Sequence, residues 1–237
     1  MKKKYPEYVI QSYADKWWET DESDALRRGR LIWAYIPYID QQPMILIPEG
    51  RTSPTEHKKI NYQLQPLQFT AARRHLKLPV AALPAFSGEI RTVYRAKERP
   101  ALVISSFSSI IPKHLKKRGA PWQYKGANLI VPIYGIEASE KRAGWNPEFI
   151  ERVKRCEYPE YMWDLIPSNT GALTESVLRF DQIQPIGDDA KNYKLTNHCL
   201  TREALEIIDE WIFWVITDHL AIDDVLSIYR KDISEID

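Results

Sequence analysis

The sequence predicts an α+β protein that is mainly β, with short strands followed by helices at the C-terminal end. Three apolar runs, 99–106, 128–135 and 176–187, have the length typical of central strands. An earlier run, 29–39, begins at Gly29 and also reads as a buried strand. This order of elements is typical of a small barrel or a curled antiparallel sheet with helices on one side.

Helices are predicted at both ends of the chain. Residues 6–27 have a partly amphipathic pattern that predicts a helix, and the hydrophobic period of 201–231 is helical. Thr201 stands where an N-cap is expected. The apolar stripe behind it comprises Leu205, Ile208, Trp211, Ile212 and Val215. Between 40 and 97, frequent prolines favour short strands and loops, with room for a helix only at 68–77.

Charge is unevenly distributed along a chain whose net charge is +1. From Glu203 onward there are ten acidic residues against two basic ones, so this segment carries −8 and the preceding residues +9. A basic body suits a polyanionic partner. The acidic end could lie over that basic face and act as an internal mimic of the polyanion. A solvated acidic helix face explains the same pattern, so both interpretations stay open.

The two cysteines and the hydropathy indicate a cytoplasmic protein. Cys156 and Cys199 match no metal-ligand or redox spacing, which is typical of reduced, structural thiols. The basic start of the chain is followed by no signal-peptide core, and no run reaches membrane-spanning length. We therefore expect no secretion and no membrane partner.

The run 176–187 places a cation and a carboxylate two residues apart. Side chains at this spacing on a strand share one face, so Arg179 and Asp181 would emerge together while Leu178 and Phe180 fill the core opposite. Two interpretations follow: a same-face surface ion pair, or a pair that shares one ligand.

A basic segment at 111–128 contains no acidic residue and interleaves cations with aromatic rings. Its predicted substrate-binding residues are Lys116, Lys117, Arg118, Trp122 and Tyr124. Cations for phosphates beside rings for bases are what a groove for single-stranded nucleic acid requires. A solvated loop is the alternative.

The order of the strand motifs resembles the MazF/PemK/Kid toxin superfamily. The resembling segments are Gly29–Trp33, Arg99–Ser105, Leu129–Ile133, Arg179–Ile186 and Leu200–Ile212. The resemblance implies one domain over 1–237, an SH3-like barrel with a C-terminal helix, enlarged by insertions at 40–97 and 136–175. It also implies an endoribonuclease that cleaves single-stranded RNA without a metal or cofactor, acting as a homodimer that a separate antitoxin protein neutralises.

The resemblance implies three catalytic residues. Arg179 and Asp181 match the family's arginine and aspartate pair, and Arg99 matches the arginine that binds the reacting phosphate. Gln182 follows in the same motif as a substrate-binding residue. Tyr134 stands where relatives carry Ser or Thr, so a hydroxyl is retained on a longer side chain.

Elementary chemistry assigns a role to each catalytic residue. Cleavage by the 2′-hydroxyl needs a base, a proton for the leaving oxygen and positive charge at the phosphorane. Asp181 fits the base and Arg99 the phosphate clamp, because its planar fork matches two phosphate oxygens. Arg179 is a poor proton donor, since the pKa of arginine is above about 12, so we expect a fixed charge. The alternative is a non-catalytic module of the same fold that binds nucleic acid or a protein.

Overall fold

In the computed structural model the chain divides into two compact units, Met1–Tyr35 with Glu98–Asp237, and Ile36–Lys97. The structure describes residues 5–53, 55, 60–72, 89–106, 126–138, 144–168 and 171–234. The sequence predicted one domain with an insertion at 40–97. The second unit, Ile36–Lys97, covers nearly the same segment.

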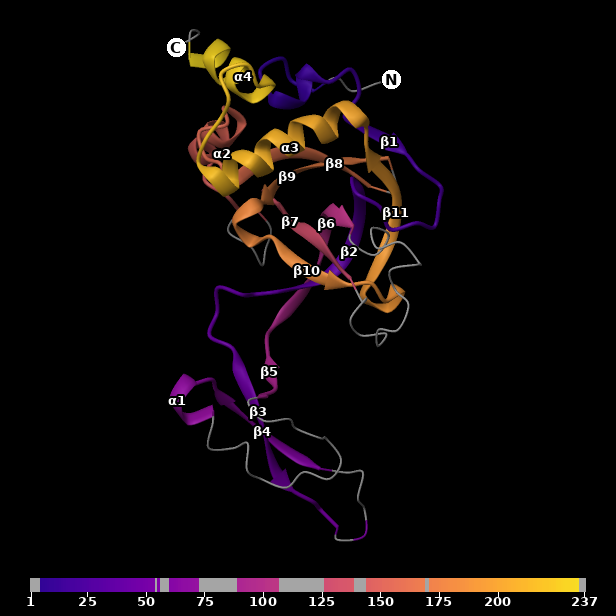
Figure 1. Cartoon of the computed structure of the whole chain (residues 1–237), viewed down its shortest axis with the longest axis vertical. Coiled ribbons are helices and arrows are strands. Elements are labelled where there is room, and N and C mark those ends of the chain that lie inside the picture. The colour runs from indigo at the N-terminus through magenta and orange to yellow at the C-terminus, as the bar shows by residue number, and fades with distance from the viewer. Residues whose placement is uncertain are drawn as a thin grey trace, which may run out of the picture. The chain divides into compact units, whose positions relative to one another are not determined.

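The larger sheet belongs to the first unit and orders its strands β1-β11-β2-β6-β7-β9-β8, with β10 also pairing β7 (Figure 1). Its strands are β1 (Trp18–Thr20), β2 (Arg30–Pro37), β6 (Ala96–Ser106), β7 (Ala127–Gly135), β8 (Tyr161–Pro167), β9 (Leu173–Arg179), β10 (Gln184–Gly187) and β11 (Tyr193–Leu200). Antiparallel pairing joins β1 to β11, β11 to β2, β6 to β7, and β7 to both β9 and β10. The predicted class, α+β and mainly β, is confirmed.

Three of the four predicted core strands lie where the sequence places them, within a few residues: β2, β6 and β7. Gly29 precedes β2 with φ of +84°, a backbone region that L-residues rarely adopt. A Cβ there would also meet Leu205 Cδ2 at 3.2 Å and Cys199 Sγ at 3.3 Å. Glycine therefore lets the chain enter the sheet tightly against β11 and the following helix.

The predicted strand 176–187 is wrong as a continuous element. The structure ends β9 at Arg179, makes a single 3₁₀ turn at Phe180–Gln182 and then begins β10. The turn redirects the chain from pairing with β7 and β8 to pairing with a different part of β7. Leu178 and Phe180 are nevertheless 1% and 2% exposed, so their predicted place in the core is confirmed.

The segment 136–175, predicted as an insertion, supplies part of the sheet. It contains helix α2 (Pro147–Lys154), strand β8 and the first residues of β9, and β8 pairs with β9 along its whole length. Asn146 caps α2 by accepting a hydrogen bond from the backbone N–H of Glu148 at 2.8 Å, and Pro147 suits the first helical turn.

The strands β8 and β9 are covered on both faces. Leu178 lies opposite Met162 and Ile133, and these three side chains belong to the main core. The alternate row places Val177 opposite Trp163, in a second core on the other face. Successive residues of a strand point to opposite faces, so the two cores sit back to back across β8 and β9.

Helix α3 (Arg202–Thr217) covers the main core and in turn carries α4 (Val225–Ser234) (Figure 1). Thr201 caps α3 as predicted, its hydroxyl accepting from Ala204 N at 3.3 Å. Trp211 is 0% exposed, and Leu226 of α4 is also 0% exposed within the same core. Both C-terminal helices are therefore structural parts of the first unit.

The helix predicted at 6–27 is wrong. The segment contains only a 3₁₀ turn at Ile10–Tyr13 and the short strand β1, which extends the sheet beyond β11. Tertiary contacts override the local pattern, because Trp17 is 2% exposed and donates to a buried carboxylate at Asp164.

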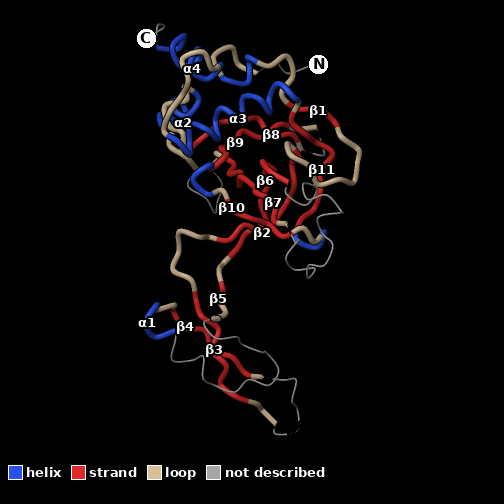
Figure 2. Tube along the Cα trace, in the orientation of Figure 1, coloured by secondary structure: helices blue, strands red, loops and turns tan. Residues whose placement is uncertain are grey.

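The second unit contains a three-stranded sheet ordered β4-β3-β5 (Figure 2). Its elements are β3 (Met44–Gly50), β4 (Asn61–Pro66), α1 (Phe69–Ala72) and β5 (Thr92–Val93). Ile45 and Ile47 form its small core. The helix expected at 68–77 appears in part as α1, and residues 73–77 lie outside the described part.

Across the described ranges, no helix is both long and apolar enough to cross a membrane. Cys156 and Cys199 are both free thiols, and burial raises the pKa of each. Neither thiol is therefore set up as a reactive thiolate.

Candidate anion-binding site

Four strands of the first unit bring together the arginine and tyrosine cluster, which we define as Arg99, Tyr134, Tyr161 and Arg179. Tyr161 of β8 lies directly opposite Arg179 of β9, and Tyr134 of β7 lies opposite Val177. The β6–β7 register pairs Ala101 with Pro132. The same antiparallel register, extended by two residues, places Arg99 beside Tyr134. All four side chains therefore share one face of β6, β7, β9 and β8.

The ring of Tyr134 is the centre of this cluster. The Arg99 guanidinium carbon lies over the ring, 4.1 Å from its centroid, and that of Arg179 lies 5.8 Å from the same centroid. A guanidinium over an aromatic face is attracted by the ring quadrupole. Two residues that are 80 positions apart in the chain thus hold their positive charges beside one ring.

Arg179 and Asp181 form a two-point ion pair. Nε of Arg179 donates to Oδ1 of Asp181 at 2.7 Å, and Nη2 donates to Oδ2 at 2.5 Å. The side chains are 21% and 29% exposed, so water and ligands reach both. The hydrogen bond from Arg179 to Asp181 raises the pKa of the guanidinium, so Arg179 keeps its proton at any physiological pH.

Gln182 orients Tyr134 from the 3₁₀ turn. The phenol of Tyr134 donates to Oε1 of Gln182 at 2.5 Å, and Gln182 is 9% exposed. Both residues were predicted to bind substrate, and the structure joins them to each other. Gln182 therefore acts on the cluster through Tyr134, by fixing the direction of its ring.

Tyr161 is the member that the sequence did not identify. The Arg179 guanidinium lies over its ring, 5.0 Å from the centroid. Tyr161 packs edge-on against Phe149 and Trp145, with centroids 5.3 and 6.1 Å apart. Its place at the start of the apolar run 161–167 was the available signal, and that run was assigned to an insertion.

The arrangement favours an anion. Two guanidinium groups lie beside one ring at a partly exposed surface, and Asp181 pairs with the guanidinium of Arg179. A guanidinium presents a planar fork that matches two oxygens of a phosphate or carboxylate. The cluster can therefore hold a phosphodiester against a fixed charge, with a carboxylate two residues along the chain from Arg179.

The residues of the predicted nucleic-acid groove lie outside the described part of the chain. They are Lys116, Lys117, Arg118, Trp122 and Tyr124. Of the predicted site, the structure brings together Arg99, Tyr134, Arg179, Asp181 and Gln182.

A second arginine and carboxylate group, at the start of β2, is paired internally, although Nε of Arg30 has no hydrogen-bond partner among the described residues. Arg30 is 2% exposed and donates to Asp21 and to the carbonyl oxygen of Ser23. Hydrogen bonds from Ser23, and then from Arg27 and Arg30, hold the pKa of Asp21 well below its usual range. This group anchors the chain before β2 and offers no free charge to a ligand.

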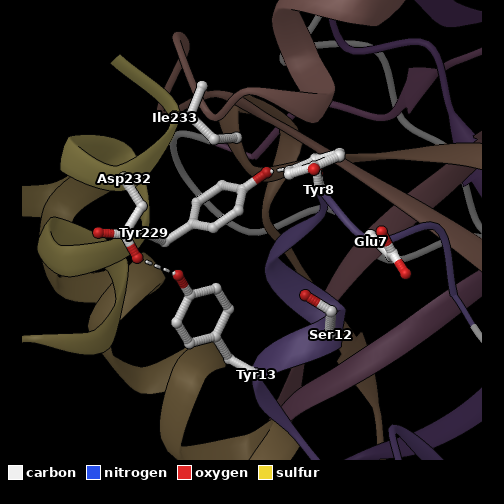
Figure 3. A pocket seen from close by; sticks show the side chains of 7 residues that line it. All are labelled: Glu7, Tyr8, Ser12, Tyr13, Tyr229, Asp232 and Ile233. Carbon is white, nitrogen blue, oxygen red and sulfur yellow. Dashed lines mark hydrogen bonds between the residues drawn. The ribbon is translucent and has the colours of Figure 1, made fainter. Parts of the chain in front are cut away.

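A cavity of about 400 Å³ between the N-terminal segment and α4 contains none of the predicted site residues (Figure 3). Tyr13 donates to Asp232 at 2.6 Å, and Tyr229 donates to the carbonyl oxygen of Tyr8 at 2.8 Å. These contacts attach α4 to the start of the chain. Asp232 therefore has a local structural partner, and the covering of a basic face by the acidic segment stays a prediction.

No family model, curated protein or solved structure matches the chain. Among the residues that the structure describes, no three His, Cys, Asp or Glu side chains are grouped so that they could hold a metal ion.

Proposed function

We propose that the protein is a MazF/PemK-like endoribonuclease that cleaves single-stranded RNA at the arginine and tyrosine cluster. The observation that carries the proposal is the convergence of Arg99 and Arg179 on the Tyr134 ring, beside Asp181. The sequence motifs that suggested these residues are far apart in the chain. Their meeting on one sheet face is what a shared phosphate site requires.

In the proposed reaction, Arg99 and Arg179 hold the scissile phosphate. Asp181 takes the proton from the 2′-hydroxyl, whose oxygen attacks phosphorus, and the bond from phosphorus to the 5′-oxygen breaks. The leaving 5′-oxygen takes a proton from water. The products are a 2′,3′-cyclic phosphate and a 5′-hydroxyl, and the two guanidinium groups stabilise the charge of the phosphorane.

The ion pair makes this mechanism conditional on substrate. Both oxygens of Asp181 accept hydrogen bonds from Arg179, so in the free protein the lone pairs that would take the proton are in use. A phosphate that enters the cluster competes for the same guanidinium donors. The substrate thereby releases Asp181 at the moment when the 2′-hydroxyl arrives, so the free enzyme is inactive and turnover is slow.

The wider assignment follows the same resemblance. We propose that the larger sheet forms an SH3-like barrel, supported by the pairing of β2 with the last strand β11 and by the 3₁₀ turn before β10. We further propose a cytoplasmic homodimer that a separate antitoxin protein neutralises. Gel filtration of the purified chain and co-purification with the product of the neighbouring reading frame test these two points.

Cleavage of a long single-stranded RNA by the purified full chain, in EDTA, tests the proposed function. We expect 2′,3′-cyclic phosphate ends, and a loss of about 100-fold or more in rate for Asp181→Asn, because a positioned base contributes this much. Glu157→Gln is the matched control, since Glu157 accepts from Arg152 at 2.6 Å in a similar exposed pair. Absence of cleavage, or equal rates for the wild type and Asp181→Asn, would refute the proposal.

A non-catalytic RNA-binding module is the second candidate. The two-point ion pair favours it, because both oxygens of Asp181 already accept hydrogen bonds from Arg179, whereas binding a phosphate needs only the guanidinium groups. Saturable binding of RNA that stays intact for hours, weakened by Arg99→Gln, would identify the module.

A further inference from the structure

A second cavity of about 540 Å³ lies between the N-terminal segment and the β8–β9 hairpin. Its volume falls in the range of about 300 to 1,000 Å³ that is usual for small-molecule sites. Tyr5, Trp17 and Trp18 supply aromatic walls, and Pro167 and Leu173 close it from the hairpin. It shares no residue with the arginine and tyrosine cluster, so it is independent of the proposed function.

Three of the hydrogen-bond donors around this cavity are already in use. The Tyr5 hydroxyl donates to Oδ1 of Asp164 at 2.7 Å, and the Trp17 indole N–H donates to Oδ2 of Asp164 at 3.0 Å. The Ser12 hydroxyl donates to the carbonyl oxygen of Val9 at 2.7 Å. Tyr5 and Trp17 therefore offer mainly carbon to a ligand, whereas the indole N–H of Trp18 has no hydrogen-bond partner among the described residues.

An acceptor is left over. Gln11 lines the cavity and is 1% exposed, and its Nε2 donates to the carbonyl oxygen of Trp163. This bond fixes the orientation of the amide, so Oε1 is the remaining group, and it has no hydrogen-bond partner among the described residues. A buried acceptor without a donor costs about 1 to 3 kcal/mol. A ligand with an N–H or O–H group would remove this cost.

The charge around the cavity is negative. Among the described residues that line it, Glu7 and Asp15 are acidic and Lys16 is basic. Asp164 lies directly behind Tyr5 and Trp17 and has no cationic partner among its hydrogen-bond donors. Burial raises the pKa of Asp164 to about 6, so the carboxylate is charged at neutral pH. An anion is disfavoured here and a cation is favoured.

We propose that this cavity binds a primary alkylammonium group. Such a group supplies the N–H donor that Gln11 lacks, the positive charge that Glu7 and Asp15 attract, and an apolar chain for the aromatic walls. A free alkylamine and the side chain of a lysine in a partner peptide share this chemistry.

Calorimetric titration of the full chain with three ligands of one length tests the proposal. At about pH 7.5 and low salt, n-pentylamine should bind at least about tenfold more tightly than 1-pentanol, and pentanoate should not bind. Equal affinity for the amine and the alcohol, or no saturable binding of the amine, would overturn the proposal. A lysine-containing peptide in place of pentylamine distinguishes the sources: tighter binding of the peptide identifies a protein side chain, and tighter binding of pentylamine a free amine.

Two variants locate the site. The exposed double change Glu7→Gln with Asp15→Asn should weaken pentylamine at least about threefold without touching the core. Gln11→Leu should abolish the preference for pentylamine over pentanol, since the acceptor is gone. Trp33→Leu, which removes an indole that is 41% exposed on β2, is the control and should bind like wild type. Unchanged affinity in the double variant would place the amine elsewhere and overturn the assignment.

Discussion

Two arginine and carboxylate pairs in the first unit have nearly the same local geometry. Nε of Arg179 donates to Asp181 at 2.7 Å, and Nε of Arg152 donates to Glu157 at 2.6 Å. Each guanidinium lies 5.0 Å from the ring centroid of a tyrosine. In both pairs the hydrogen bond to the carboxylate raises the pKa of the arginine. Local electrostatics therefore does not distinguish them.

The two pairs differ in their surroundings, which strands far away in the sequence supply. The side chains of Arg152 and Glu157 are 56% and 35% exposed, against 21% and 29% for Arg179 and Asp181. Near Arg179, the strands β6 and β7 add a second guanidinium and a second ring, from Arg99 and Tyr134. The comparison teaches that a candidate site is marked by long-range convergence of charge and not by an ion pair as such.

The sharpest test of this comparison removes one arginine from each region. Arg99→Gln should lower the rate of RNA cleavage by about 100-fold or more, because a positioned charge at the phosphorane contributes on this order. Arg152→Gln should leave the rate within about twofold, since its pair is more exposed and its guanidinium does not lie over Tyr134 or Tyr161. The measurement is a single-turnover rate with excess protein. Equal effects of the two changes would mean that the cluster has no special role.

Asp164 extends the comparison to a carboxylate that accepts hydrogen bonds from uncharged donors. It is 1% exposed and accepts from Tyr5, Trp17 and the backbone of Leu165, and burial raises its pKa to about 6 against about 3.9 for an unfolded chain. Between these two pKa values the folded state binds more protons than the unfolded state. The free energy of unfolding should therefore fall by about 2 to 3 kcal/mol as pH rises from about 4 to 6.5.

Urea unfolding of wild type and Asp164→Asn across this pH range measures the effect. The Asn variant is less stable overall, because its amide nitrogen cannot accept from Trp17. In this variant the part of the pH dependence of unfolding that Asp164 causes should disappear. The exposed change Asp223→Asn is the control and should keep the wild-type slope. Parallel pH profiles for wild type and Asp164→Asn would contradict the assignment.

Much of the fold follows from the sequence, because apolar runs and a helical stripe are local patterns. The strands at 99–106 and 128–135 and the N-cap at Thr201 are in this class. The N-terminal segment and β8 are not, since β1 and β8 are fixed by burial of Trp17 and by pairing with β9. The contact of Trp17 joins residues more than 100 positions apart. The pairing of β8 with β9 leaves no periodic signal in the sequence.

The candidate site divides in the same way. The pairing of Arg179 with Asp181 follows from their spacing, although a 3₁₀ turn replaces the expected strand geometry. No spacing places Arg99 against Tyr134, and only the family resemblance suggested both. Tyr161 could not be found, because its role depends on the register of β8 against β9. Local chemistry is readable from the sequence, and register across strands is not.

Nucleic-acid binding without cleavage further separates the role of Arg99 from that of Arg152. Single-stranded DNA lacks the 2′-hydroxyl, so it reports on phosphate contacts alone. Arg99→Gln should weaken its binding about tenfold and reduce the slope of log affinity against log salt by about 0.7, the value for one phosphate contact on a single strand. Arg152→Gln should change neither quantity. An unchanged slope in Arg99→Gln would exclude a direct contact between Arg99 and a phosphate.

The smallest expected effect concerns the tyrosine hydroxyls. Tyr134→Phe removes the hydrogen bond to Gln182, leaves a buried acceptor on that amide, and should cost about 1 kcal/mol of stability. Tyr158→Phe, beside Arg152, should cost less than about 0.5 kcal/mol, because its ring contacts remain intact. Since the Arg99 guanidinium lies over the carbon face of Tyr134, Tyr134→Phe should retain DNA binding to within about threefold, whereas Tyr134→Leu should lose it. Equal DNA binding by Tyr134→Phe and Tyr134→Leu would show that the ring does not orient Arg99, and the resemblance between the two arginine regions would then extend to their function.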